Sequence, residues 1–323
     1  MKVAVTGANG HLGANVVRAL LGAQHEVIAV VRNGSDCRSL NDLDVQLRRA
    51  EITNADDIVR ALQGASHVIN LAAVISIDGD RNGLVSKTNV MGPQVVADAC
   101  LKLRARMVHV SSIHAFSSDP DRPVLDETAE RPSADAFSYD RSKYLGEQAV
   151  RKKIAEGLDA VIVNPTGIIG PYDYGSSYAG KMLSQLFNSG LPALVEGGFD
   201  WVDARDVAAS CVAALTRGAT GENYILSGKF ATMKELAEQC ERVSGKPGPR
   251  ISFPIWVAAL GLPVLAAWCR LTASPPLYTK ESLKALQEAN RNVSSKKASE
   301  ALGHSARPLP LTLADCYDWY RRS

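Results

Sequence analysis

Short apolar runs alternate with helical patterns through the first half of the chain. The runs are rich in β-branched residues and predict strands at 3–6, 27–31, 44–48, 67–71, 107–111 and 160–164. Apolar positions at helical spacing predict helices near 11–21, 55–63, 85–103 and 140–156. Such alternation implies a parallel sheet with helices on both faces, and ligands then bind at the carboxyl ends of the strands.

The pattern changes after Asn164. Residues 165–171 are rich in proline and glycine, and the remainder predicts helices with short strands near 191–195, 199–202 and 223–226. The expected fold class is therefore α/β, with a doubly wound parallel sheet. We expect a first domain over 1–164 that carries the candidate catalytic residues. A smaller, mainly helical substrate-binding lobe over 165–323 should follow, with segments near 198–226 returning to the sheet.

No charged residue occurs between Ile251 and Cys269. Two tryptophans flank the middle of this run, and its length approaches that of a bilayer span. Two prolines and a glycine interrupt it. We expect a kinked apolar helix that covers the substrate pocket, and weak contact with a membrane surface is the alternative.

Composition narrows the class of protein. The net charge of +2 over 323 residues creates no global field for nucleic acid, and none is expected as a partner. The six cysteines lack CxxC or zinc spacing and are typical of reduced thiols in a cytoplasmic protein. Glycines interrupt the N-terminal apolar run, so no signal peptide is expected. His11, His109 and His114 form no ligand cluster, so we expect no metal and interpret His109 as a core residue.

Three glycines at three-residue spacing follow the first predicted strand: Gly7, Gly10 and Gly13. A side chain at Gly7 or Gly10 would crowd the turn and keep a diphosphate from the backbone amides. Gly13 lets the following helix lie close to the strand. The N-terminus of that helix carries partial positive charge for phosphates. The pattern predicts a Rossmann domain that binds a dinucleotide.

Tyr139 and Lys143 lie one helical turn apart on one face of a predicted helix. An ammonium beside a phenol favours the phenolate and brings the tyrosine pKa, about 10 when free, toward neutral. An incidental pair on a surface helix is the alternative. Ser111 and Ser112 end a strand at the predicted ligand edge, where a hydroxyl can bind a reacting carbonyl oxygen. They can instead end the strand through a local backbone bond.

Arg32 follows the second predicted strand, where the adenosine ribose of a coenzyme is expected. NAD usually meets an acidic residue there, whereas a guanidinium suits the 2′-phosphate of NADP. Arg38 can add a second contact. Asp36 stands in the same loop and could bind an NAD ribose, although it comes late. We therefore expect NADP(H), with NAD(H) as the less favoured coenzyme.

Together these motifs resemble the extended short-chain dehydrogenases/reductases of the NAD-dependent epimerase/dehydratase superfamily. Nearest is the branch of dihydroflavonol reductases, cinnamoyl-CoA reductases and 3β-hydroxysteroid dehydrogenases. The resemblance covers nearly the whole chain and rests on residues 6–13, 70–73, 110–113, 139–143, 164–171 and 201–208.

The resemblance implies roles for particular residues. Tyr139 would hand a proton to the substrate oxygen, and Lys143 would tune it and hold the nicotinamide ribose. The second serine, Ser112, would orient the carbonyl. Asn89 would support the site, or else only satisfy a helix kink. Glu51 replaces the aspartate that contacts the adenine amine in relatives.

The expected coenzyme-binding residues are Gly7, Asn9, Gly10, His11, Leu12, Gly13, Arg32, Arg38, Glu51, Ile52, Leu71, Ala72, Ala73, Ser111, Tyr139, Lys143, Pro165 and Ile168. The expected substrate-lining residues are Ile75, Ile113, His114, Tyr172, Tyr178 and Trp201. Because the segments lining the pocket are largely apolar or aromatic, we expect a hydrophobic ketone, aldehyde or alcohol as substrate. A monomer and a homodimer are both open.

The leading hypothesis is an NADPH-dependent carbonyl reductase, or the same reaction run backwards. The first alternative is a nucleotide-sugar epimerase or dehydratase with tightly bound NAD. That enzyme needs basic residues for a diphosphate, and Arg205 and Lys181 are candidates. The second alternative is a binding protein that senses NADP, against which the intact Tyr139 and Lys143 pair counts.

Overall fold

The computed structural model describes residues 1–119, 122–175, 177–262 and 278–322. Its large sheet has seven strands in the order β10-β6-β5-β4-β1-β2-β3. All neighbouring pairs in that sheet are parallel. The strands are β1 (Lys2–Thr6), β2 (Glu26–Val31), β3 (Val45–Arg49), β4 (His67–Asn70), β5 (Arg106–Val110), β6 (Ala160–Pro165) and β10 (Asn223–Leu226). The predicted doubly wound parallel sheet is confirmed.

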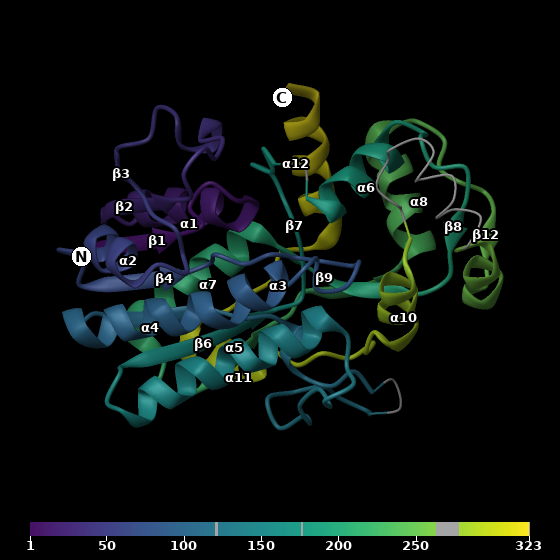
Figure 1. Cartoon of the computed structure of the whole chain (residues 1–323). Helices are drawn as coiled ribbons and strands as arrows, with labels where there is room; N and C mark the ends of the chain where they lie inside the picture. The colour runs from purple at the N-terminus through teal and green to yellow at the C-terminus, as the bar shows by residue number, and fades with distance from the viewer. Residues whose placement is uncertain (120–121, 176, 263–277, 323) are drawn as a thin grey trace.

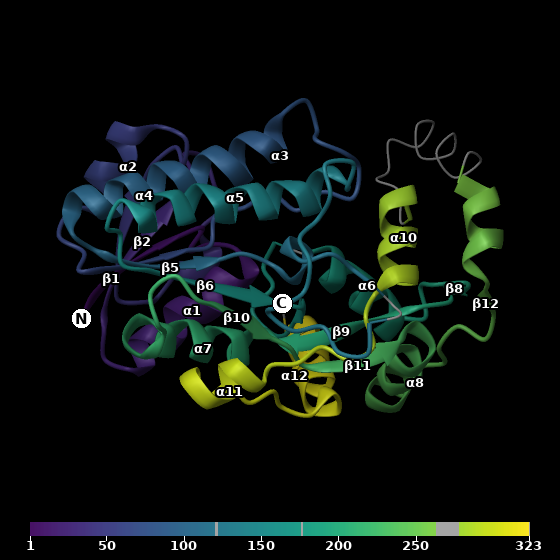
Figure 2. The same ribbon diagram turned by 90° about the horizontal axis from the view of Figure 1, so that it is seen from below.

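Helices cover both faces of this sheet (Figure 2). One face carries α1 (His11–Gly22), α7 (Ala204–Arg217) and α11 (Lys296–Leu302). The other carries α2 (Ala55–Leu62), α4 (Gly92–Leu103) and α5 (Ser138–Ala155). Each face has its own buried cluster of Val, Ile, Leu and Ala, so the strands are apolar on both sides. This burial explains the near-continuous apolar runs in the sequence.

The single helix predicted over 85–103 contains a π turn. It runs through α3 (Leu84–Ser86), the π-helical residues Lys87–Met91 (labelled η2) and α4. Pro93 has no backbone N–H to donate to the carbonyl of Asn89, which breaks the regular helical ladder. That carbonyl faces α5, where a Cβ at Gly146 would collide with it. Gly146 therefore allows the two helices to approach closely.

The second half builds a separate lobe beside the large sheet (Figure 1). A three-stranded sheet has the order β11-β9-β7, and β12 pairs with β8. The strands are β7 (Gly167–Ile169), β8 (Leu194–Val195), β9 (Gly198–Asp203), β11 (Lys229–Thr232) and β12 (Ser252–Phe253). The helices are α6 (Tyr178–Phe187), α8 (Met233–Ser244), α10 (Lys280–Glu288) and α12 (Leu309–Arg322). These elements enclose their own apolar core.

The two strands in the region 198–226 belong to different sheets. β10 returns to the large sheet, as expected, and α7 covers that sheet. β9 instead joins the small sheet, between β7 and β11. The expected return of some segments near 198–226 to the large sheet therefore holds for β10 and does not include β9. β6 runs almost directly into β7, which pairs with β9 and draws it into the second lobe.

The uncharged run from Ile251 does not begin as a helix, because β12 pairs with β8. Residues 255–262 are helical, and the rest of the run lies outside the described residues. Trp256 and Leu260 are 67% and 72% exposed. Among the described residues, no helix has both the length and the apolar character required to cross a bilayer. Contact of this run with a membrane surface stays a prediction.

Candidate active site

A tight turn joins β1 to α1. Gly7 has φ +67°, in the left-handed region, and a Cβ there would lie 3.0 Å from the Ala72 nitrogen. A Cβ at Gly13 would lie 2.7 Å from the Ala8 carbonyl carbon, so only glycine lets α1 pack this closely on the turn. At Gly10 the nearest atom would be 3.4 Å away. The crowding expected at Gly7 is therefore present, the crowding expected at Gly10 is mild, and Gly13 allows the close packing of the helix that was expected.

The N-terminus of α1 is suited to an anion. Gly10 caps the helix without a side-chain hydrogen bond, and the first turn has no acidic residue. The His11 ring lies 3.1 Å from the Gly170 carbonyl oxygen, and burial lowers its pKa. The Nε2 nitrogen is thus occupied by the segment after β7, and the backbone of His11 lies in the first turn of α1, where the N–H groups can face a diphosphate. Leu12 packs into the apolar cluster beneath the sheet.

The segment after β4 is shaped by Thr6. Its hydroxyl donates to Asn70 Oδ1 at 2.6 Å and accepts the backbone N–H groups of Leu71 and Ala72 at 3.2 and 3.3 Å. Ala73 follows and is exposed. Thr6 therefore holds the backbone of Leu71 and Ala72, two of the expected coenzyme-binding residues, close to Gly7.

Two arginines meet at the carboxyl ends of β2 and β3. Arg32 is exposed, and Arg49 Nη1 donates to the Arg32 carbonyl oxygen at 3.3 Å. No ion pair involves the Arg32 guanidinium within the described residues. Arg38, by contrast, is bound to Asp36 at 2.7 Å. Arg49 was not among the residues expected from the sequence, although it ends β3, the strand next to β2.

The remaining expected coenzyme contacts lie around the same edge. Asn9 Nδ2 donates to the Asp36 carbonyl oxygen at 2.9 Å, which ties the Arg38 loop to the glycine turn. Glu51 follows β3 and accepts from Thr53 Oγ1 at 3.5 Å. Ile52 packs on Gly92. Pro165 ends β6 and is buried. Ile168 lies in β7 and packs against the apolar cluster of the large sheet.

The two serines after β5 have different environments. Ser112 Oγ accepts the backbone N–H of His114 at 3.2 Å, and it lies close enough to Tyr139 to lower the pKa of the phenol. Since the His114 N–H occupies a lone pair of Oγ, the Ser112 proton is free to point toward the phenol or a carbonyl oxygen. Ser111 Oγ is buried with no partner among the described residues. Such an orphaned hydroxyl at the ligand edge is suited to a bound coenzyme.

Tyr139 and Lys143 both emerge from α5 toward the end of β5. Lys143 is 5% exposed, and its Nζ donates to the Val110 carbonyl oxygen at 3.2 Å. Burial raises the pKa of Tyr139 to about 12, while the hydrogen bond with Ser112 opposes the rise. The expectation that the lysine brings the phenol pKa toward neutral is therefore wrong here. The Lys143 ammonium is bound to the backbone, and burial dominates.

Burial also lowers the pKa of Lys143 to about 8. His109 lies behind it in β5, where burial first and the lysine charge second lower its pKa to about 3. Its Nδ1 lies 3.2 Å from Asn70 Nδ2, and the ring is 3% exposed. The interpretation of His109 as a core residue is confirmed. No cluster of His, Cys, Asp and Glu suited to a metal occurs within the described ranges.

Asn89 lies in the π turn and is 2% exposed. Its side chain accepts the Val74 N–H at 2.8 Å and donates to the Val74 carbonyl oxygen at 2.9 Å. It also donates to Ser142 Oγ at 3.0 Å. The amide therefore fixes the segment after β4 against α5. These bonds give Asn89 a positioning role next to the candidate catalytic residues.

His114 is the expected substrate-lining residue that the structure brings next to Tyr139. The two ring centroids lie 5.4 Å apart in an edge contact. His114 Nδ1 lies 2.8 Å from Asp140 Oδ1, and both side chains are about one-third exposed (32% and 30%). The sequence analysis did not consider Asp140, although it directly follows Tyr139.

The other substrate-lining predictions lie in varied surroundings. Ile75 and Tyr178 are 54% and 45% exposed. Ile113 packs on a small cluster around Phe116. The centre of the Tyr172 ring lies 4.3 Å from the Arg18 guanidinium carbon, and the ring makes a tilted contact with Trp319 of α12. These contacts give Tyr172 a packing function between α1 and α12.

Trp201 lies in β9 and is 6% exposed within the core of the second lobe. Its Nε1 is buried without a hydrogen-bond partner among the described residues. The roles of all six residues in substrate binding stay predictions.

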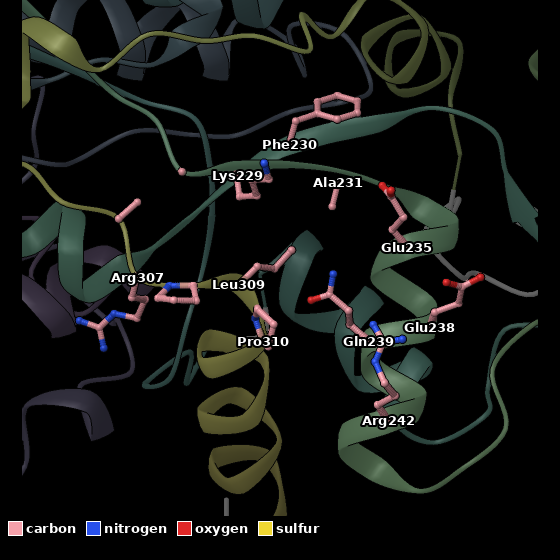
Figure 3. A pocket seen from close by; sticks show the side chains of 13 residues that line it. Lys229, Phe230, Ala231, Glu235, Glu238, Gln239, Arg242, Arg307, Leu309 and Pro310 are labelled. Atoms are coloured by element: carbon pink, nitrogen blue, oxygen red, sulfur yellow. The ribbon is translucent and has the colours of Figure 1, made fainter.

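A cavity of about 590 Å³ lies elsewhere, between β11, α8 and the start of α12 (Figure 3). Phe230, Gln239 and Arg242 are among its lining residues. None of its lining residues belongs to the sites expected from the sequence. It is therefore separate from the edge where Ser112, Tyr139 and Lys143 meet.

Comparison with known proteins yields relatives along the whole chain. Residues 3–227 match the NAD dependent epimerase/dehydratase family. The chain is 32% identical to sterol demethylase protein B from Methylococcus capsulatus, with 99% of this chain and 98% of that protein covered. It is 30% identical to a putative dihydroflavonol 4-reductase from Synechocystis sp., with 98% and 94% covered.

Solved structures share the fold over its full length. A protein named gox2253 has a TM-score of 0.85 and 30% identity, with 99% of this chain and 98% of that chain covered. A nucleoside-diphosphate-sugar epimerase from Pseudomonas aeruginosa has a TM-score of 0.81 and 27% identity, with 100% and 98% covered.

Proposed function

The chain belongs to the NAD dependent epimerase/dehydratase family and is an NAD(P)-dependent oxidoreductase. Within that family, we propose that it interconverts the carbonyl and alcohol forms of a hydrophobic small molecule with NADP(H). One observation carries the proposal. Ser112, Tyr139 and Lys143 converge from β5 and α5 at the carboxyl edge of the sheet, where Lys143 Nζ lies 3.2 Å from the Val110 carbonyl oxygen and the Ser112 hydroxyl lies close enough to Tyr139 to lower the pKa of the phenol.

Ser112 and Tyr139 have different roles at the substrate oxygen. The nicotinamide coenzyme, when bound, supplies or accepts the hydride. The Ser112 hydroxyl donates a hydrogen bond to the carbonyl oxygen and stabilises the charge that develops there. Because burial raises the pKa of Tyr139 to about 12, the phenol keeps its proton at neutral pH. It can give that proton to the alkoxide-like oxygen that forms when a carbonyl is reduced, because that oxygen is a stronger base.

Lys143 contributes a buried positive charge one helical turn from the phenol. Its ammonium offers a donor to the nicotinamide ribose, while burial outweighs any effect of this charge on the phenol pKa. Ser111, with its unpartnered hydroxyl, is a second polar group available to the coenzyme at this edge. The fit of the glycine turn and the uncapped N-terminus of α1 to a diphosphate supports the same coenzyme class.

The choice of NADP(H) rests on Arg32. Its exposed guanidinium has no ion-pair partner among the described residues, whereas Arg38 is already bound to Asp36. An unpaired guanidinium at the end of β2 suits a 2′-phosphate. Arg49 adds a second cation next to it. Asp36, which could serve an NAD ribose, accepts from Arg38 instead.

A hydrophobic substrate is supported by the apolar and aromatic residues expected at the pocket and by the names of relatives. One relative is a sterol demethylase protein, and others are a putative dihydroflavonol reductase and a cinnamoyl-CoA reductase. Arg205, a candidate for binding a sugar-nucleotide diphosphate, is bound to Asp203 and Asp315, each at 2.7 Å. Its occupied guanidinium counts against the epimerase alternative.

A substrate panel tests the proposal. Purified protein should oxidise NADPH with hydrophobic ketones or aldehydes, followed by loss of nicotinamide absorbance, and NADH should be the poorer donor. Nucleotide sugars with a matching carbonyl serve as the contrasting substrates. Turnover of nucleotide sugars alone, with NAD retained through purification, would reject the proposal in favour of an epimerase or dehydratase.

A further inference from the structure

Glu147 is a buried carboxylate that the proposed chemistry leaves unexplained. It follows Tyr139 and Lys143 at four-residue intervals, so all three lie on one face of α5. Its exposure is 0%. Burial of a carboxylate is costly unless hydrogen bonds and an opposite charge compensate for it. Its partners should therefore reveal what the charge does.

Three donors from three different segments satisfy Glu147. Its Oε1 accepts from Asn164 Nδ2 of β6 at 2.6 Å. Its Oε2 accepts from Asn223 Nδ2 of β10 and from Arg131 Nη1, each at 3.1 Å. Asn223 Nδ2 also donates to Asn164 Oδ1 at 2.7 Å, which fixes the orientation of the Asn164 amide. The carboxylate thus joins α5 to two neighbouring strands.

This network reaches the catalytic serine. Asn164 Nδ2 donates to the Ser112 carbonyl oxygen at 2.9 Å as well as to Glu147. Arg131 Nη1 donates to the Ala115 carbonyl oxygen at 3.0 Å. Both ends of the turn from Ser112 to Ala115 are therefore held by groups that Glu147 orients. The position of the Ser112 hydroxyl depends on that turn.

Glu147 also acts on Lys143 through its charge. Burial lowers the pKa of Lys143 to about 8, and the negative charge of Glu147 opposes this fall. The titratable groups around the pair are His109 from β5, Arg131 from the preceding loop, and Tyr144 and Arg151 from α5. His109 is neutral above its pKa of about 3, while Arg131 donates to Glu147 itself and Arg151 donates to Asn223.

We propose that Glu147 is a positioning residue of the active site. Through Asn164 it fixes the turn that carries Ser112, and its charge keeps Lys143 a cation. The proposal rests on the function proposed for Ser112, Tyr139 and Lys143. Both effects can be measured separately, because one acts through a hydrogen bond and the other through charge.

Two substitutions separate the effects. Glu147→Gln keeps the length of the side chain and removes its charge, although its NH2 group takes the place of one of the two accepting oxygens. Glu147→Asp keeps the charge and shortens the reach to Asn164. Glu156→Gln is the matched control, since it makes the same chemical change at the exposed end of α5. The first readout is an NMR titration of protein labelled with ¹³C-lysine. The Lys143 signal is assigned by its absence in Lys143→Arg.

In Glu147→Gln the Lys143 titration should move to lower pH by about one unit, and the alkaline limb of kcat/KM should follow it. Glu147→Asp should leave that titration near pH 8 but lower kcat by roughly tenfold, with the KM for NADPH little changed. Glu156→Gln should change neither. An unmoved Lys143 titration in Glu147→Gln overturns the proposal, even if activity falls.

If Glu147→Gln does not fold, kcat and the Lys143 titration of Glu147→Asp test the proposal. A kcat equal to that of the wild type in Glu147→Asp overturns the positioning role. A Lys143 titration that moves about one unit to lower pH in Glu147→Asp, although the negative charge is kept, overturns the role of charge. The NMR titration requires no substrate. Its outcome is therefore distinct from failure of the proposed function, which would appear as turnover that does not depend on Tyr139.

Discussion

Replacing Arg32 by alanine removes the cation that we assign to the 2′-phosphate of NADPH. The guanidinium is exposed and has no ion-pair partner among the described residues, so its loss leaves no other charge unpaired. A hydrogen bond to a charged group contributes about 1.5–3 kcal/mol. Since about 1.4 kcal/mol corresponds to a tenfold change, the Kd for NADPH should rise roughly 10- to 100-fold. The Kd for NADH, which lacks this phosphate, should stay nearly constant.

Arg38→Ala is the matched control for this prediction. Arg38 lies six residues further along the chain, but its guanidinium is 2.7 Å from Asp36. Its charge is therefore compensated at the surface, and the Kd for NADPH should change less than about threefold. Calorimetric titration of both coenzymes into both variants measures these effects. An equal loss of NADPH and NADH affinity in Arg32→Ala would refute the reasoning, as would an equal effect of the two arginines.

Three further predictions concern the glycine turn and the catalytic edge. Gly13→Ala should prevent α1 from packing on the turn, because the new Cβ would lie 2.7 Å from a backbone carbon. A thermal-shift experiment with and without coenzyme should show a lower melting temperature and much weaker coenzyme binding. Ser112→Ala should lower kcat about 100- to 1000-fold, while Ser111→Ala should mainly raise the KM for NADPH; steady-state kinetics that reverse this pattern contradict the assignment. Because the Lys143 pKa is lowered to about 8, the ammonium is lost as pH rises through that value, so kcat/KM for NADPH should fall there, and a flat profile up to pH 10 would count against a role for its charge.

The large sheet could be predicted from the sequence because each strand is buried on both faces. Apolar runs and glycine punctuation located its strands to within one residue at each end. The second lobe was harder to predict. β7 and β11 have only three and four residues, and their burial is partial. Such strands depend on partners far away in sequence, so no local pattern marks them.

In the candidate site, too, some features could be predicted from the sequence and others depend on the fold. The spacing of Tyr139 and Lys143 correctly placed both on one face of α5, but spacing could not show where the lysine nitrogen points. In the structure it donates to Val110, and burial sets both pKa values. Glu147 lies four residues after Lys143, a signal present in the sequence. Its importance depends on complete burial and on Asn164, which only the fold brings to it.

The central claim is that Tyr139, held beside Ser112 and Lys143, donates the proton that completes carbonyl reduction. Tyr139→Phe keeps the aromatic ring and removes only the hydroxyl. Single-turnover reduction of the best substrate from the panel, with NADPH binding measured in parallel, tests the claim directly. We predict a rate lower by about 100- to 10,000-fold with the Kd for NADPH unchanged. A variant that reduces the substrate at the wild-type rate would contradict the account.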